Sequence, residues 1–65
     1  MLLNIHSQIK EAVGKQVVVN TKKSEKFVGT IIWASPDFTM AELKMKDGHI
    51  KLITDITIKQ ISITQ

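Results

Sequence analysis

Cysteine and arginine are both absent from this 65-residue chain, which also has no tyrosine and only one proline. Without cysteine there are no disulfides and no thiolate metal sites. Without arginine, bidentate contacts to guanine edges or phosphates are excluded, so any nucleic-acid binding must use lysine charges, stacking and backbone groups. No apolar run is long enough for a membrane span, and the N-terminus lacks the basic and apolar regions of a secretion signal. We therefore expect a cytoplasmic protein with no membrane partner.

Isoleucine, valine and threonine make up about a third of the chain, a proportion typical of β-sheet proteins. At 7.3 kDa the chain has room for one hydrophobic core, so residues 1–65 should form a single domain. Such a small domain buries only about 60% of its unfolded surface and commonly needs disulfides, a metal or partner subunits. Because cysteine is absent, we expect association with further copies of the chain. The net charge of +3 permits a nucleic-acid partner without requiring one.

A change of apolar period at Gly14 predicts the order of the elements. Before it, apolar residues recur at helical spacing and indicate a short amphipathic helix over about residues 3–13. After it, β-branched runs and turn signals predict five strands within about residues 16–63. The second strand is apolar on both faces and has Gly29 in its interior, where we expect a strong bend. We assign Phe27, Ile31 and Trp33 to one face of it and Val28, Ile32 and Ala34 to the other.

The last strand carries isoleucines whose phase slips between Ile58 and Ile61, which indicates a bulge or a change of neighbouring strands. We expect isoleucines on both faces of this segment at the edge of the sheet. Unpaired apolar edges favour pairing with another chain, and a closed ring of copies would cover them. The residues predicted at the subunit interface are Ile50, Leu52, Ile53, Ile56, Ile58 and Ile61.

Three segments resemble the Sm-like (LSm) family. Residues 14–19 (GKQVVV) are similar to its first strand, residues 27–31 (FVGTI) to its second, and residues 35–40 (SPDFTM) to its first motif. The Ser35-Pro36 pair resembles the ataxin-2 type of Sm domain. The resemblance implies a mostly β fold, with a short N-terminal helix and a strongly bent five-stranded antiparallel sheet forming an SH3-like open barrel. It also implies homo-oligomeric rings of about five to eight subunits that commonly bind single-stranded RNA around the pore.

The same resemblance suggests where RNA would bind, although two family features are missing. The family's third loop presents an aromatic residue or methionine and an asparagine; here Phe38 and Met40 can stack, but no asparagine follows. Thr54 and Asp55 replace an Arg-Gly pair. The RNA-binding candidates are Asp37, Phe38, Thr39, Met40, Thr54 and Asp55. The alternative is an Sm-fold structural or protein-interaction module without nucleic-acid binding, and a monomeric SH3-like peptide binder ranks last.

Several single residues admit more than one interpretation. Phe38 is either a stacking platform for a base or a plug that folds back onto the sheet. Trp33, inside an apolar strand, is expected in the core or at a subunit interface rather than at a base. The lysines around the first hairpin turn, Lys22, Lys23 and Lys26, are expected to be solvated.

No catalytic or metal-binding pattern is present in the sequence. Asp37, Asp47 and Asp55 each fall in a turn, where aspartate makes local hydrogen bonds. His6 and His49 have no second imidazole or thiolate at ligand spacing, so we expect each to be a lone solvent-facing histidine. There is no phosphate-binding glycine loop and no activated nucleophile. We therefore predict a non-enzymatic protein with no cofactor and no metal.

Overall fold

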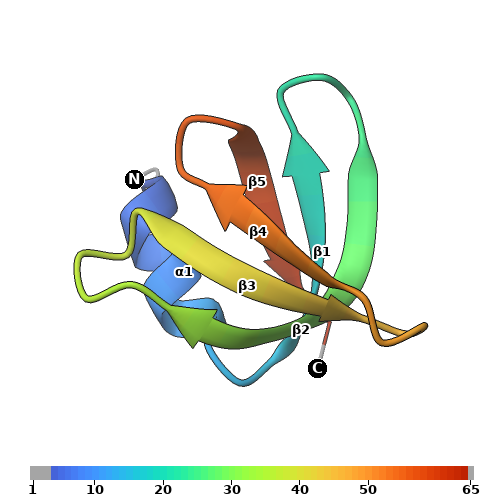
Figure 1. The fold of residues 1–65 in the computed structure, drawn as a ribbon. Helices are drawn as coiled ribbons and strands as arrows, with labels where there is room; N and C mark the ends of the chain where they lie inside the picture. The colour runs from blue at the N-terminus through green and yellow to red at the C-terminus, as the bar shows by residue number, and fades with distance from the viewer. Residues whose placement is uncertain (1–3, 65) are drawn as a thin grey trace.

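The computed structural model describes residues 4–64 and shows one helix and a five-stranded antiparallel sheet (Figure 1). The sheet is strongly curved and open, with strand order β4-β3-β2-β1-β5. The mostly β composition and the helix-first order predicted from the sequence are confirmed. The elements are α1 (Ile5–Ala12), β1 (Gln16–Thr21), β2 (Lys26–Ala34), β3 (Met40–Met45), β4 (Ile50–Thr54) and β5 (Ile58–Ile63).

Helix α1 begins with a side-chain cap and ends just before a glycine. The Oδ1 atom of Asn4 accepts a hydrogen bond from the backbone N–H of Ser7 at 2.8 Å, as an N-cap does. Gly14 has a φ of 81°, which ends the helical segment. Ile9 and Ala12 are fully buried, and α1 packs mainly on β5. The expected start of the helix at residue 3 lies outside the described residues.

Strand β2 contains a bulge that reverses the predicted assignment of two side chains. Its register with β3 shifts between Ile31 and Trp33, so Ile32 is the extra residue. As a result Trp33 lies on the outer side, 43% exposed, and Ala34 lies half-buried against the core. The expectation that Trp33 shares a face with Ile31 was therefore wrong, and Trp33 is outside the core. The prediction assumed that side chains alternate strictly between the two faces, and one inserted residue breaks this alternation.

A second register shift in β5 brings its first two isoleucines to the same side of the sheet. Ile58 pairs with Thr21 and Ile61 with Val19, although they are three residues apart. Both side chains are buried, at 1% and 8% exposed, so the prediction that isoleucines fall on both faces of this strand was wrong for them. Of the two alternatives expected from the isoleucine spacing, the structure shows the bulge, and this extra residue is the physical reason. The core consists of Ile9, Ala12, Val17, Val19, Ile31, Ala41, Leu43, Ile53, Ile58 and Ile61.

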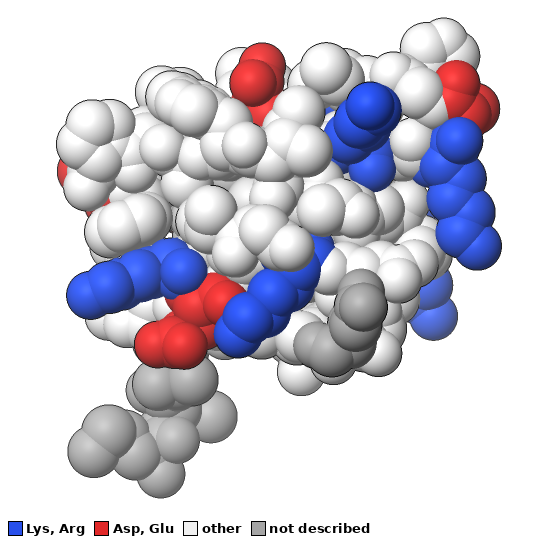
Figure 2. Space-filling model, turned by 90° about the horizontal axis from the view of Figure 1, so that it is seen from below, with Lys and Arg blue, Asp and Glu red and all other residues white. Residues whose placement is uncertain are grey.

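Charged residues of both signs are spread over the surface. Figure 2 shows the face seen from below, where lysines and acids lie around a largely uncharged centre. Such interspersed charges create no extended field of a single sign on this face. Within residues 4–64, the one helix is too short to cross a membrane.

Candidate functional site

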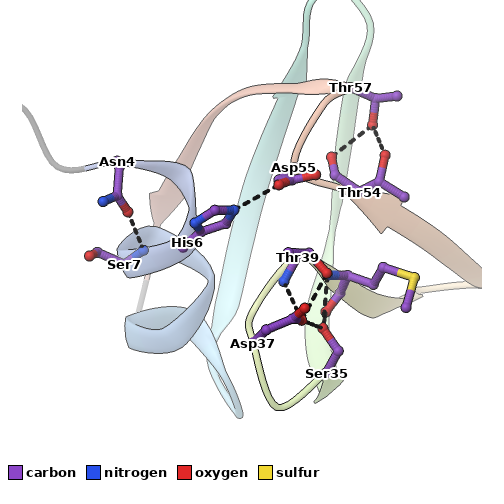
Figure 3. A network of polar contacts seen from close by, with 10 residues as sticks. Asn4, His6, Ser7, Ser35, Asp37, Thr39, Thr54, Asp55 and Thr57 are labelled. Carbon is purple, nitrogen blue, oxygen red and sulfur yellow. Dashed lines mark hydrogen bonds and ion pairs between the residues drawn. The ribbon is translucent and has the colours of Figure 1, made fainter.

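The loop between β2 and β3 is organised around the carboxylate of Asp37 (Figure 3). Its Oδ1 atom accepts hydrogen bonds from the hydroxyl of Thr39 at 2.8 Å, the backbone N–H of Thr39 at 3.2 Å and the hydroxyl of Ser35 at 2.9 Å. These bonds, the Thr39 hydroxyl first, hold the pKa of Asp37 below its ordinary value of 3.8. Asp37 is thus a charged group used within the loop, in accordance with the local role expected of a turn aspartate.

Backbone hydrogen bonds close the base of the same loop. The N–H of Ser35 donates to the carbonyl of Met40 at 2.9 Å, and the N–H of Met40 donates to the Ser35 hydroxyl at 3.0 Å. The N–H of Phe38 donates to the Ser35 carbonyl at 2.9 Å. Ser35 is only 5% exposed, and these contacts satisfy its polar groups without water. Residues 35–39 therefore form an ordered turn with a defined shape.

Phe38 folds toward the core instead of standing out from the loop. Its φ of 58° lies in the left-handed region, which is uncommon for a residue with a side chain. The ring is half-buried and packs against the core cluster. This geometry fits the interpretation in which the Phe38 ring folds back onto the sheet, and not the one in which the ring stands out to stack on a base. Met40, at 38% exposed, is the more accessible of the two residues expected to stack.

The turn between β4 and β5 lies directly beside this loop. The N–H of Asp55 donates to the carbonyl of Thr39 at 2.8 Å, and Thr54 pairs with Met40 across β3 and β4. The Thr57 hydroxyl donates to the Thr54 carbonyl at 3.0 Å and shapes the turn. Five of the six RNA-binding candidates are thereby joined by hydrogen bonds or strand pairing: Asp37, Thr39, Met40, Thr54 and Asp55. The sixth, Phe38, turns its ring toward the core.

A histidine from α1 joins the site, which the sequence did not indicate. His6 Nε2 lies 2.7 Å from Asp55 Oδ2, so the helix is tied to the β4–β5 turn (Figure 3). His49 likewise contacts Asp47, with Nδ1 2.7 Å from Oδ2. Each histidine therefore has an aspartate partner and is not alone, while both side chains face solvent as expected, at 49% exposed for His6 and 79% for His49. No local pattern could reveal the first pair, because His6 and Asp55 are 49 residues apart.

The surface formed by the β2–β3 loop and the β4–β5 turn carries groups suited to noncovalent contact with another molecule. It offers the thioether of Met40, the hydroxyls of Thr39 and Thr54, and two carboxylates. The carboxylates disfavour phosphates close by, while the thioether and hydroxyls suit the edge or face of an unpaired base. Residues 4–64 hold no group of three or more histidine or acidic side chains placed to bind a metal ion.

The six predicted interface residues divide into two groups. Ile53, Ile58 and Ile61 are buried in the core of their own chain, so their side chains have little surface left for a neighbour. Ile50 and Leu52 on β4 are 55% and 56% exposed, and Ile56 in the β4–β5 turn is 74% exposed. Of the six predicted residues, only those of the second group therefore have apolar side chains exposed to a neighbour.

Two further contacts have no signal in the sequence. The Oε1 atom of Gln8 on α1 accepts the backbone N–H of Ile61 at 2.8 Å. The ammonium of Lys51 lies 4.6 Å from the centre of the Phe27 ring. Both join segments that are far apart in the chain and meet only after the sheet has curved.

No protein-family model matches the chain, and no curated protein matches it either. The function must accordingly be inferred from the residues and their geometry.

Proposed function

We propose that the chain is an Sm-like subunit that assembles with copies of itself into a closed ring and binds single-stranded RNA without catalysis. The observation that carries the proposal is the open sheet with β4 at one edge and β5 at the other. Pairing of β4 of one copy with β5 of the next is a heterologous contact, and such contacts close into a ring when the rotation fits. The order of the elements and the three Sm-like segments support the same assembly.

The free edge of β4 presents a regular set of backbone groups. The N–H of Met45 donates to the His49 carbonyl at 2.8 Å, and the N–H of Asp55 donates to the Thr39 carbonyl at 2.8 Å. In an antiparallel pair every second residue bonds to the partner strand, so between His49 and Asp55 the residues that bond to β3 are Lys51 and Ile53. The N–H and C=O groups that point away from β3 are those of Ile50 and Leu52 and the N–H of Thr54. The Thr54 carbonyl accepts hydrogen bonds from Thr57 within the turn. The side chains of Ile50 and Leu52 are little more than half exposed, and complete burial of such a side chain gives about 1.5–3 kcal/mol. Covering both would stabilise each interface by about 2 kcal/mol.

The free edge of β5 is shorter. The N–H of Thr64 donates to the Gln16 carbonyl at 2.9 Å, so the groups that point away from β1 are those of Ile61 and Ile63. Gln8 accepts the N–H of Ile61. The proposed pairing therefore uses the carbonyl of Ile61 and both backbone groups of Ile63, whose side chain is 43% exposed.

The RNA part of the proposal rests on the adjacent loops. Thr39, Met40 and Thr54 lie together at one end of β4, so a ring would repeat this contact surface once per subunit. Met40 would contact a base, and lysines elsewhere on the ring would supply the salt-dependent part of the affinity.

Native mass spectrometry tests the assembly. We expect a single ring mass for the unmodified protein and a monomer for Leu52→Lys, because a lysine on the free edge opposes strand pairing. Val28→Lys is the matched control, since Val28 is 39% exposed but lies on an inner strand. A monomeric unmodified protein, or a Leu52→Lys protein that keeps the ring mass, contradicts the ring.

Fluorescence anisotropy with U-rich and A-rich oligonucleotides at two salt concentrations tests RNA binding. We expect binding that weakens as salt rises, and a several-fold loss for Met40→Ala. Ile32→Ala, which shortens an exposed side chain on β2, should bind normally. If the ring binds neither oligonucleotide at low salt, the proposal of RNA binding is refuted.

In that case the second candidate applies: an Sm-fold structural or protein-interaction module. The observation that favours it is the loop itself, where Phe38 is turned inward and both carboxylates are held by internal hydrogen bonds. In that candidate, the loop residues stabilise the fold and contact no RNA.

A further inference from the structure

A pocket of about 380 Å³ lies between β4, the β1–β2 hairpin and the β4–β5 turn. In Figure 1 the tips of the hairpin and of the turn stand at the top of the molecule. The backbone N–H of Lys22 in the hairpin donates to the Thr57 carbonyl in the turn at 2.9 Å, which fixes one side of the rim. A volume of this size suits one small organic ligand.

Lysines dominate the charge of this pocket. Lys22, Lys23 and Lys51 line it against a single acid, Glu25, which gives the lining a net charge of +2. Within residues 4–64 the two ion pairs join histidine to aspartate, so none of these lysines has a carboxylate partner. Lys51 is half-buried with its ammonium 4.6 Å from the centre of the Phe27 ring. The contact with the ring holds the ammonium in place without neutralising it.

The remaining lining is mainly apolar. Leu52, Ile53 and Ile56 form walls, and threonine hydroxyls lie among them. An apolar wall beside an unneutralised cluster of cations suits a ligand with an anionic group and a planar or apolar body.

We propose that this pocket binds a nucleoside monophosphate group, with the phosphate among Lys22, Lys23 and Lys51 and the base against the apolar walls. A phosphate monoester carries a charge of about −1.5 to −2 at neutral pH, which balances the lining, whereas a carboxylate leaves it positive. The group has two possible sources, a free nucleotide or the phosphorylated end of an RNA strand.

This site is separate from the proposed RNA contact at Thr39 and Met40. Only Thr54 belongs to both, and residues 35–39 do not line the pocket. The pocket and the RNA contact can therefore fail independently, whereas Leu52 and Ile56 line the pocket and also belong to the exposed apolar edge proposed for the ring.

Isothermal titration of the full-length protein with AMP and UMP tests the proposal. Adenosine and uridine, which lack the phosphate, and inorganic phosphate, which lacks the base, serve as partial ligands. We expect the nucleotides to bind at least tenfold more tightly than either half, because both parts of the pocket are then used. Equal affinity for AMP and inorganic phosphate overturns the proposal.

Two variants locate the site, so that a folding defect in one of them does not obscure the result. Lys51→Gln and Lys23→Gln should each weaken AMP binding by about tenfold. Lys46→Gln is the matched control, because it removes the same charge at the exposed β3–β4 turn outside the pocket. Wild-type affinity in folded Lys51→Gln and Lys23→Gln proteins overturns the assignment.

The source of the group is settled by comparing AMP with a short RNA that does or does not carry a 5′-phosphate. Binding of AMP at least as tight as that of the 5′-phosphorylated RNA indicates a free nucleotide, whereas tighter binding of the phosphorylated RNA than of AMP indicates a strand end. Failure of all three ligands overturns the site. Met40→Ala should leave AMP binding unchanged, and this result separates the pocket from the loop surface.

Discussion

Gly29 in β2 offers a sharp test of how the sheet is packed. It is buried, and a Cβ atom placed there would overlap the carbonyl oxygen of Lys44 and lie 3.1 Å from Cγ of Leu43. Carbon atoms normally rest about 3.5–4.0 Å apart, and a strand backbone cannot turn aside as a flexible side chain can. Gly29→Ala must therefore push β3 away from β2, and overpacking of this kind costs about 1–3 kcal/mol.

The cost is large relative to the whole stability. At about 0.05–0.15 kcal/mol per residue, a domain of this length is stable by roughly 3–10 kcal/mol. A loss of about 2 kcal/mol lowers the melting temperature by roughly 8–16 °C. Circular dichroism at one fixed protein concentration measures this shift, because assembly would make stability depend on concentration.

A second glycine gives the control. Gly48 has a φ of 91° with nothing within 4 Å of an added Cβ, so Gly48→Ala introduces only backbone strain. That strain costs about 1–2 kcal/mol, and Gly29→Ala should be at least as destabilising. An unchanged melting temperature for Gly29→Ala would refute the close approach of β2 and β3.

Two further predictions concern polar contacts. Because hydrogen bonds lower the pKa of Asp37 below 3.8, their stabilisation is present above that pH and is lost as the pH falls through the folded value. The melting temperatures of wild type and Asp37→Asn should therefore differ near neutral pH and converge in acid; a constant difference would count against this linkage. Gln8→Ala leaves the part-buried N–H of Ile61 without its acceptor and should cost about 1–3 kcal/mol in urea unfolding. Gln8→Glu keeps an acceptor oxygen and should lose less, and equal losses would assign the effect to packing.

The arrangement of the site links the helix to both loops. His6 contacts Asp55, and Asp55 in turn donates its N–H to Thr39. These two contacts tie α1 to the β4–β5 turn and the turn to the β2–β3 loop. In a ring, this connection would set the position of Met40 relative to the β4 edge.

Local patterns predicted the elements because short-range physics forms them. Apolar residues at helical spacing, followed by a glycine with positive φ, define α1. Along β3 the apolar and charged residues alternate cleanly, and Ala41 and Leu43 lie in the core. The turn role of Asp37 also follows from local hydrogen bonding, which depends only on residues next to it.

Contacts between distant segments depended on the three-dimensional packing alone. The bulge at Ile32, which had no signal in the sequence, moved Trp33 to the surface. The spacing of the isoleucines did signal an irregularity in β5, but only the pairing with β1 placed Ile58 and Ile61 on one side. Periodicity assumes a constant two-residue repeat, so one inserted residue reverses every assignment beyond it. The His6–Asp55 pair and the lysine-lined pocket form only when the curved sheet brings β4 and its flanking turns beside α1 and the first hairpin, because residues separated by tens of positions carry no mutual signal along the chain.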